Sequence, residues 1–78
     1  MNEKELVEFI AKSLVDNPDK VQINVVESEK STILELSVDE PDIGKIIGKH
    51  GRIAKAVRII LSAVSNKSNK RVLLDIMD

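Results

Sequence analysis

The sequence predicts an α+β fold in which a three-stranded sheet carries three helices on one face. Three observations lead to this prediction. In helical segments, apolar residues recur every three to four positions, which is typical of amphipathic helices. In three other segments they alternate with polar residues, which is typical of strands. The segments follow one another as α-β-β-α-α-β, and 78 residues provide for one small domain.

The first helix is expected over residues 2–15. Asn2 followed by Glu5 three residues later resembles a capping box, which satisfies the free amides at a helix start. Pro18 ends the helix, because the residue before a proline avoids the helical region. The stripe expected to face the core consists of Leu6, Phe9, Ile10 and Leu14.

Two strands are expected over residues 20–27 and 31–38. The short polar turn between them predicts an antiparallel hairpin. A third strand is expected over residues 70–76, after a polar loop at 66–69. Two helices separate it from the second strand, and a crossover of this length allows a parallel pair. The apolar face is expected to hold Val21, Ile23, Val25, Leu34, Leu36, Val38, Val72, Leu74 and Ile76.

Two further helices flank a glycine-containing turn. A short helix is expected over residues 41–47, where Pro41 suits a first helical turn. A longer helix is expected over residues 52–65. Its core stripe is predicted to hold Ile53, Val57, Ile60, Leu61 and Val64.

Charge is divided unevenly along the chain. Residues 1–42 carry 4 basic and 11 acidic side chains, whereas residues 43–78 carry 8 basic and 2 acidic ones. A basic half beside an acidic half favours a surface that binds a polyanion. The alternative interpretation is a charged face that is merely solvated.

Composition excludes several classes of function. The chain has no Cys and one His, so it offers no disulfide, no thiol nucleophile and no histidine cage for a metal. It has no Trp or Tyr and one Phe, which excludes stacking platforms built on aromatic side chains. No carboxylate pair stands at a recognisable catalytic spacing, so we expect neither an enzyme nor a cofactor. The acidic start is unlike a signal peptide and no apolar run could span a membrane, so the cytoplasm is the expected location.

All three glycines fall within eight residues, at Gly44, Gly48 and Gly51. Glycine allows a sharp turn and a close approach of the backbone to a ligand. Gly51 precedes the long helix, whose first amides attract phosphate. Lys49, His50 and Arg52 add basic side chains at the same place. The segment therefore predicts a phosphate-binding turn, with a plain helix–helix turn as the alternative.

Two known phosphate-binding motifs fail on spacing in this segment, whereas one DNA-binding motif stays open. The spacing from Gly44 to Gly48 is one residue too short for a Walker A loop, and His50 takes the place of its Ser or Thr. The same spacing fails the dinucleotide fingerprint. A helix-turn-helix DNA binder stays open, since two helices joined by a glycine turn match its description.

The run Ile46-Ile47-Gly48-Lys49-His50-Gly51 resembles the G-x-x-G hallmark of the KH domain, which clamps a nucleic-acid backbone. Here it lies within β-α-GxxG-α-β, and the preceding α-β resembles the type II arrangement. Residues 43–58 and the full length of residues 1–78 resemble the KhpA family of small bacterial KH-domain proteins. One difference is His50, where these loops commonly have Lys or Arg.

The resemblance implies a single KH domain over residues 1–78 that binds single-stranded RNA and acts as an RNA chaperone. It also implies a homodimer and a complex with KhpB, also called Jag or EloR, a larger KH-domain protein tied to cell elongation and cell-wall homeostasis. The residues expected to contact RNA are Gly48, Lys49, His50, Gly51, Arg52, Lys45, Lys55, Ile46 and Ile47, with the isoleucines as an apolar floor or, alternatively, part of the core.

The long helix also carries a predicted dimer surface. At 100° per residue, Ile59 lies well off the core stripe, with small alanines nearby. A second copy of the helix could approach closely along this strip, in a self-complementary two-fold contact. The strip consists of Ala56, Ile59, Ile60 and Ala63. An interaction subunit with little RNA affinity of its own is therefore the second functional hypothesis.

Overall fold

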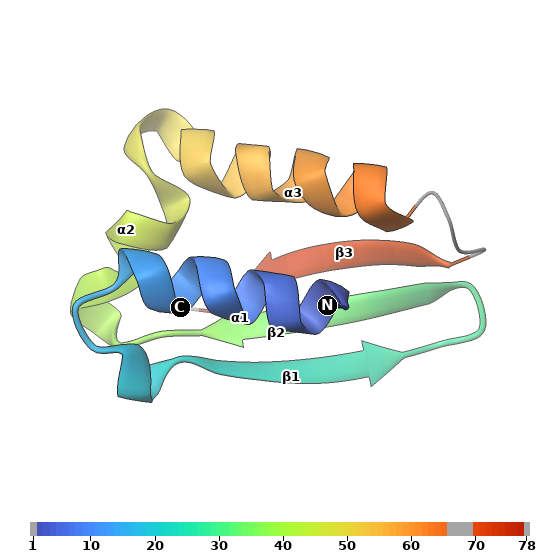
Figure 1. The fold of residues 1–78 in the computed structure, drawn as a ribbon, viewed down its shortest axis with the longest axis horizontal. Coiled ribbons are helices and arrows are strands. Elements are labelled where there is room, and N and C mark those ends of the chain that lie inside the picture. The colour runs from blue at the N-terminus through green and yellow to red at the C-terminus, as the bar shows by residue number, and fades with distance from the viewer. Residues whose placement is uncertain (1, 66–69, 78) are drawn as a thin grey trace.

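The computed structural model describes residues 2–65 and 70–77. Its elements follow the predicted α-β-β-α-α-β order (Figure 1), and the predicted loop at 66–69 lies outside the described residues. The described residues also contain three short 3₁₀ turns that the sequence did not predict. They lie between the helices and strands: η1 (Pro18–Lys20), η2 (Glu40–Asp42) and η3 (Lys49–Gly51). The helices and strands are α1 (Glu3–Leu14), β1 (Gln22–Glu27), β2 (Ser31–Ser37), α2 (Ile43–Ile47), α3 (Arg52–Ser65) and β3 (Arg71–Ile76).

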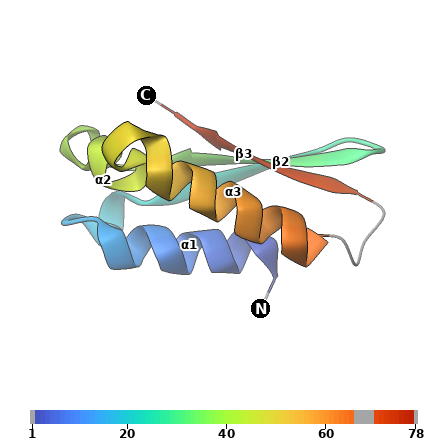
Figure 2. The ribbon, with the colours of Figure 1, turned by 90° about the horizontal axis from the view of Figure 1, so that it is seen from above.

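The three strands form one mixed sheet in the order β1-β2-β3. β1 pairs antiparallel with β2, and β2 pairs parallel with β3, as predicted. Val25 lies opposite Leu34, which in turn lies opposite Leu74, so these side chains share one face. The helices cover that face (Figure 2). Leu34 and Leu36 are each only 2% exposed, which places the core between the sheet and the helices.

Helix α1 begins with the predicted capping box: Oδ1 of Asn2 accepts a hydrogen bond from the amide of Glu5 at 2.8 Å. The predicted core stripe is wrong in part. Val7 and Ala11 are the buried residues of α1, whereas Phe9 is 64% exposed. Small side chains at the contact allow a helix to lie close to the sheet. Larger neighbours such as Ile10 then pack at the side of the contact.

Helix α3 is also turned from its predicted orientation. The predicted stripe included Ile60 and Val64, but these are 43% and 39% exposed. The cause is the width of the apolar arc on α3, which exceeds what the sheet and α1 cover. The residues that α3 buries are Ala54, Val57, Leu61 and Ser65.

Candidate nucleic-acid interface

The turn between α2 and α3 lies at one end of the domain (Figure 1). Three of its four residues have positive φ: Gly48 at 79°, His50 at 59° and Gly51 at 74°. His50 is the one non-glycine residue with positive φ among those the structure describes. A left-handed conformation costs a non-glycine residue about 1–2 kcal/mol. The loop thus holds the imidazole of His50 on a strained backbone at the tip of the turn.

Gly48 is required for a second reason. A Cβ atom built at Gly48 would lie 2.6 Å from Cγ1 and 2.9 Å from the backbone nitrogen of Ile53. The backbone at Gly48 therefore touches the first turn of α3, which fixes how α2 and α3 meet. Gly51 faces open space and is required only for its φ. Gly44 has neither a positive φ nor a close neighbour.

The backbone amides of the turn divide into two groups. The amide of Gly48 donates to the carbonyl of Gly44 at 2.9 Å, and that of Gly51 to the carbonyl of Gly48 at 3.0 Å. The amide of Arg52 donates to the carbonyl of Lys49. The amides of Lys49 and His50 make no hydrogen bond with the described part of the chain. Of the amides predicted to bind phosphate in the turn, these two are therefore the ones free to donate to a ligand.

The basic side chains around the turn differ in their pairing. Lys49, His50, Arg52 and Lys55 are exposed, and none forms an ion pair with a residue in the described ranges. An unpaired cation on the surface attracts a polyanion without first breaking another contact. These four side chains, together with the free amides of the turn, form what we call the loop surface.

Lys45 lies outside the loop surface. Its Nζ pairs with the carboxylate of Asp16 and lies 3.4 Å from Oδ1 of Asp42. The hydrogen bond that Lys45 donates to Asp16, with a further contribution from Asp42, raises the pKa of Lys45 against the opposing effect of desolvation. Two carboxylates therefore compete with any phosphate for the Lys45 ammonium group.

The isoleucines expected to contact RNA differ in their exposure to solvent. Ile46 is 3% exposed and belongs to the core, so its side chain is buried and does not form an apolar floor for bases. Ile47 is 37% exposed, and Ile53 is partly buried against the core. Of the two isoleucines proposed as contacts, only Ile47 presents apolar surface next to the turn.

The predicted dimer strip is exposed on α3. Ile59 is 61% exposed, Ile60 is 43% exposed, and both alanines of the strip, Ala56 and Ala63, are exposed. Phe9 of α1 is a further exposed apolar residue of the helical layer, which sequence periodicity had assigned to the core.

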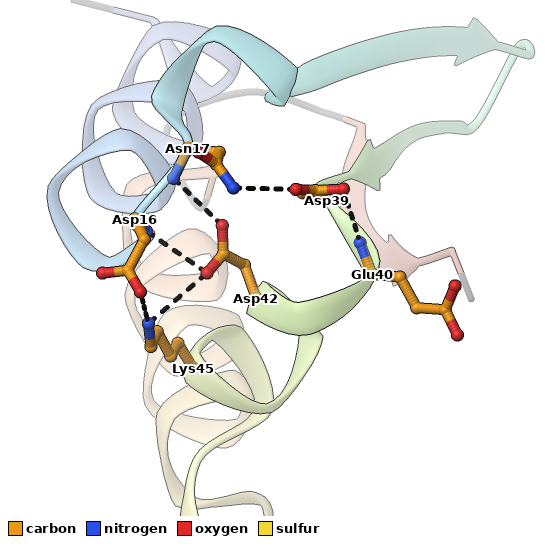
Figure 3. A network of polar contacts seen from close by, with 6 residues as sticks. All are labelled: Asp16, Asn17, Asp39, Glu40, Asp42 and Lys45. Atoms are coloured by element: carbon orange, nitrogen blue, oxygen red, sulfur yellow. Dashed lines mark hydrogen bonds and ion pairs between the residues drawn. The ribbon is translucent and has the colours of Figure 1, made fainter.

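Sequence reasoning did not predict the part played by Asp42, which directly precedes α2. Asp42 is 1% exposed and is the one buried charged residue in the described part of the chain. Its carboxylate accepts hydrogen bonds from the backbone amides of Asp16 and Asn17 (Figure 3). No spacing motif could reveal this, because the partners are 25 and 26 residues away.

Within residues 2–65 and 70–77, no three acidic or histidine side chains gather as a metal would require. None of the helices described there is long and apolar enough to cross a bilayer.

Two helices joined by a G-x-x-G turn, set between two strands of a three-stranded mixed sheet and preceded by α1 and β1, define a KH-type domain. A family model described as "KhpA/KhpB, KH domain" matches residues 4–76. The chain belongs to this family.

Curated relatives extend over nearly the whole chain. A protein of Borreliella burgdorferi named RNA-binding protein KhpA is 61% identical over 77 residues, which are 99% of this chain and 94% of that relative. The proteins of the same name from Clostridium perfringens and Aquifex aeolicus are 57% and 52% identical, covering 95% and 96% of this chain and 99% and 95% of their own lengths. No solved structure gives a significant match.

Proposed function

We propose that this protein binds single-stranded RNA through the loop surface and that it does so without catalysis. The observation that carries the proposal is the loop surface itself: two free amides and four unpaired basic side chains on a G-x-x-G turn. The relatives in three bacteria are named RNA-binding proteins, and the family is one of binding domains rather than enzymes.

The geometry supports a different role for each part of the loop surface in binding RNA. The amides of Lys49 and His50 can donate to phosphate oxygens, as donors do in backbone clamps of this type. Lys49, Arg52 and Lys55 contribute attraction that does not depend on base sequence. Ile47 offers apolar contact to an unstacked base. Single strands suit such a surface, because their backbone can follow the turn.

The test reverses charge on the turn. Replacing both Lys49 and His50 with Asp places carboxylates where phosphates would bind, so binding of a single-stranded RNA oligonucleotide should be abolished in a filter-binding assay. Both side chains are exposed, so circular dichroism should report an unchanged fold. Wild-type affinity in this variant would overturn the proposal.

A matched control removes the same net charge from positions away from the loop surface. The variant Lys4→Gln with Lys30→Asp changes exposed residues at the start of α1 and in the β1–β2 turn. It should bind RNA nearly as well as the wild type, since the β1–β2 turn lies at the opposite end of the domain from the α2–α3 turn, and the start of α1 is the end of that helix away from α2 (Figure 1).

We further propose that the protein is cytoplasmic, that it acts as an RNA chaperone and that it assembles with a second KH-domain chain, either its own copy or a KhpB-type partner. The cellular setting of cell elongation and cell-wall homeostasis follows from the family resemblance alone. The exposed apolar strip on α3 supports the assembly.

The same strip favours a second candidate function, an interaction subunit with little RNA affinity of its own. The filter-binding assay on the isolated protein discriminates the two: negligible affinity of the wild type with retained partner binding would favour the interaction subunit. A helix-turn-helix DNA binder is disfavoured, because α2 has only 5 residues.

A further inference from the structure

The buried carboxylate of Asp42 joins two segments that are distant in sequence (Figure 3). Its Oδ1 accepts a hydrogen bond from the amide of Asp16 at 3.2 Å, and its Oδ2 accepts one from the amide of Asn17 at 3.1 Å. Both amides belong to the stretch that follows the end of α1. One side chain therefore uses both of its oxygens to hold the same short stretch of backbone.

Three further contacts reinforce this junction. Lys45, one turn further along the chain, contacts the Asp42 carboxylate and pairs with the side chain of Asp16. The side-chain amide of Asn17 donates to the carboxylate of Asp39 at 2.7 Å. Burial alone raises the pKa of Asp42, but the two backbone amides and Lys45 outweigh it and leave that pKa below its ordinary value. The carboxylate is therefore held in its charged form.

The position of this junction matters for the loop surface. Asp42 is the last residue of η2 and directly precedes α2, which leads within 5 residues into Gly48. A helix of one turn has little stability of its own, so its contacts with the rest of the domain, which include the buried Ile46 and those at its two ends, decide where it lies. At its far end, Gly48 packs against Ile53 of α3. At its near end, the buried carboxylate of Asp42 attaches α2 to the stretch that follows α1, through hydrogen bonds from the amides of Asp16 and Asn17.

We propose that Asp42 is a positioning residue for the loop surface: by fixing the start of α2 to the end of α1, it sets where the amides of Lys49 and His50 lie. The inference deepens the proposed function, since its consequence for RNA affinity rests on the loop surface being the binding site.

The chemistry explains why an ionised carboxylate is used. A buried charge is costly unless it is paired and hydrogen-bonded, and Asp42 meets both conditions. An asparagine of nearly the same shape has only one acceptor oxygen, and its NH₂ group would face a backbone N–H. One of the two amides would then lose its partner, and the attachment of α2 would loosen without a change in volume.

The test compares Asp42→Asn with Asp16→Asn. Both variants lose one negative charge, but Asp16→Asn removes only an exposed ion pair and leaves the two backbone bonds in place. Two quantities are measured at a temperature where circular dichroism shows each protein fully folded. The first is the Kd for a single-stranded RNA oligonucleotide. The second is the chemical shift and hydrogen exchange of the Lys49 and His50 amides without RNA.

For Asp42→Asn we expect a Kd about five- to tenfold higher than that of the wild type. The corresponding loss of binding free energy lies within the free-energy cost of one broken buried hydrogen bond. We also expect shifted resonances and faster exchange at both loop amides. Asp16→Asn should stay within about twofold of the wild-type Kd, because it leaves the buried bonds intact. If Asp42 only stabilised the fold, Asp42→Asn would have a lower Tm than the wild type, and the Kd of the folded variant would be unchanged.

The inference is overturned if folded Asp42→Asn keeps both the wild-type Kd and the wild-type loop resonances. If Asp42→Asn is unfolded, Asp42→Glu decides by the same two measurements, because it keeps the charge on a side chain one methylene longer and must displace α2. If wild-type protein binds no RNA but the loop resonances still move in the variant, the proposed function fails and the positioning of the loop by Asp42 stands.

Discussion

At the scale of single residues, the three glycines of this chain have three different roles. Gly48 is required both for its φ of 79° and for the space that Ile53 occupies. Gly51 is required for its φ alone, and Gly44 for neither reason. A glycine in a helix costs about 1 kcal/mol relative to alanine. Gly44 therefore lowers the free energy of unfolding, although no turn or close contact within the domain requires a glycine there.

This difference gives the first prediction. Gly48→Ala should lower the free energy of unfolding by about 2–4 kcal/mol, because it combines left-handed strain with a clash against the backbone of α3. Gly44→Ala is the matched control and should raise the free energy of unfolding by up to about 1 kcal/mol. Chemical denaturation followed by circular dichroism measures both. Equal effects would contradict the assignment of Gly48 as the packed position.

A second residue-scale prediction concerns acid. The pKa of Asp42 lies below its ordinary value in the folded protein, whereas an aspartate in an unfolded chain has a pKa of about 3.9. The ionised carboxylate therefore favours folding above about pH 4, and its contribution is lost as the pH falls through the lowered pKa. The Tm of the wild type should fall on acidification.

The corresponding measurement is a series of thermal melts from about pH 6 to about pH 3. Asp42→Asn should have a lower Tm at neutral pH and a shallower fall in acid, because its side chain does not titrate. The other carboxylates are common to both proteins. Parallel curves for the two proteins would show that Asp42 does not contribute to the acid sensitivity.

At the scale of elements, α3 carries more apolar surface than one domain covers. Its buried residues face the sheet, while Arg58 lies beside β3 and donates two hydrogen bonds of 3.3 Å to the carbonyl of Leu74. This contact occupies an acceptor on an edge strand, where an open backbone invites pairing with another chain. The apolar strip on α3 is left facing away from the sheet.

The element-scale prediction is that this strip forms a homodimer. Ile59→Lys should convert a dimer into a folded monomer, because a lysine desolvated at a two-fold contact would face its own copy. Sedimentation of both proteins at tens of micromolar measures the change. The control Val26→Lys adds the same charge at an exposed apolar position on the sheet face away from the helices and should remain dimeric. A monomeric wild type, or a dimeric Ile59→Lys variant, would refute the prediction.

At the scale of the whole molecule, charge and topology coincide. The acidic half of the sequence supplies α1, β1 and β2, and the basic half supplies α2, α3 and β3. The ion pair between Asp16 and Lys45 joins the two halves beside the junction at Asp42. The loop surface therefore projects from the basic half, at the end of the domain where the two helices meet.

This arrangement predicts a salt-dependent affinity. If about two to four phosphates are neutralised, the logarithm of the association constant should fall against log salt with a slope of about −1.4 to −2.8. Titrations of a single-stranded RNA oligonucleotide at several salt concentrations give the slope. Single-stranded RNA should also compete better than duplex DNA. A slope near zero would mean that the basic half is only a solvated surface.

The sequence alone was sufficient to predict the order of the elements, the strand faces, the capping box at Asn2 and the glycine turn. These features depend on local chemistry: periodicity, cap residues and the backbone freedom of glycine. The loop residues Lys49, His50 and Arg52 were found for the same reason, because they adjoin the turn in the chain. Their contact with RNA stays a prediction.

Only the tertiary structure decided which side of each helix meets the sheet. On α1 the buried positions are Val7 and Ala11, while Phe9 is exposed, because close packing of the helix on the sheet favours smaller apolar side chains over larger ones at the contact. It also decided that Ile46 belongs to the core. Above all it revealed Asp42, whose buried carboxylate binds amides 25 and 26 residues away. Such a bond depends on how distant segments meet in space, and no local pattern encodes it.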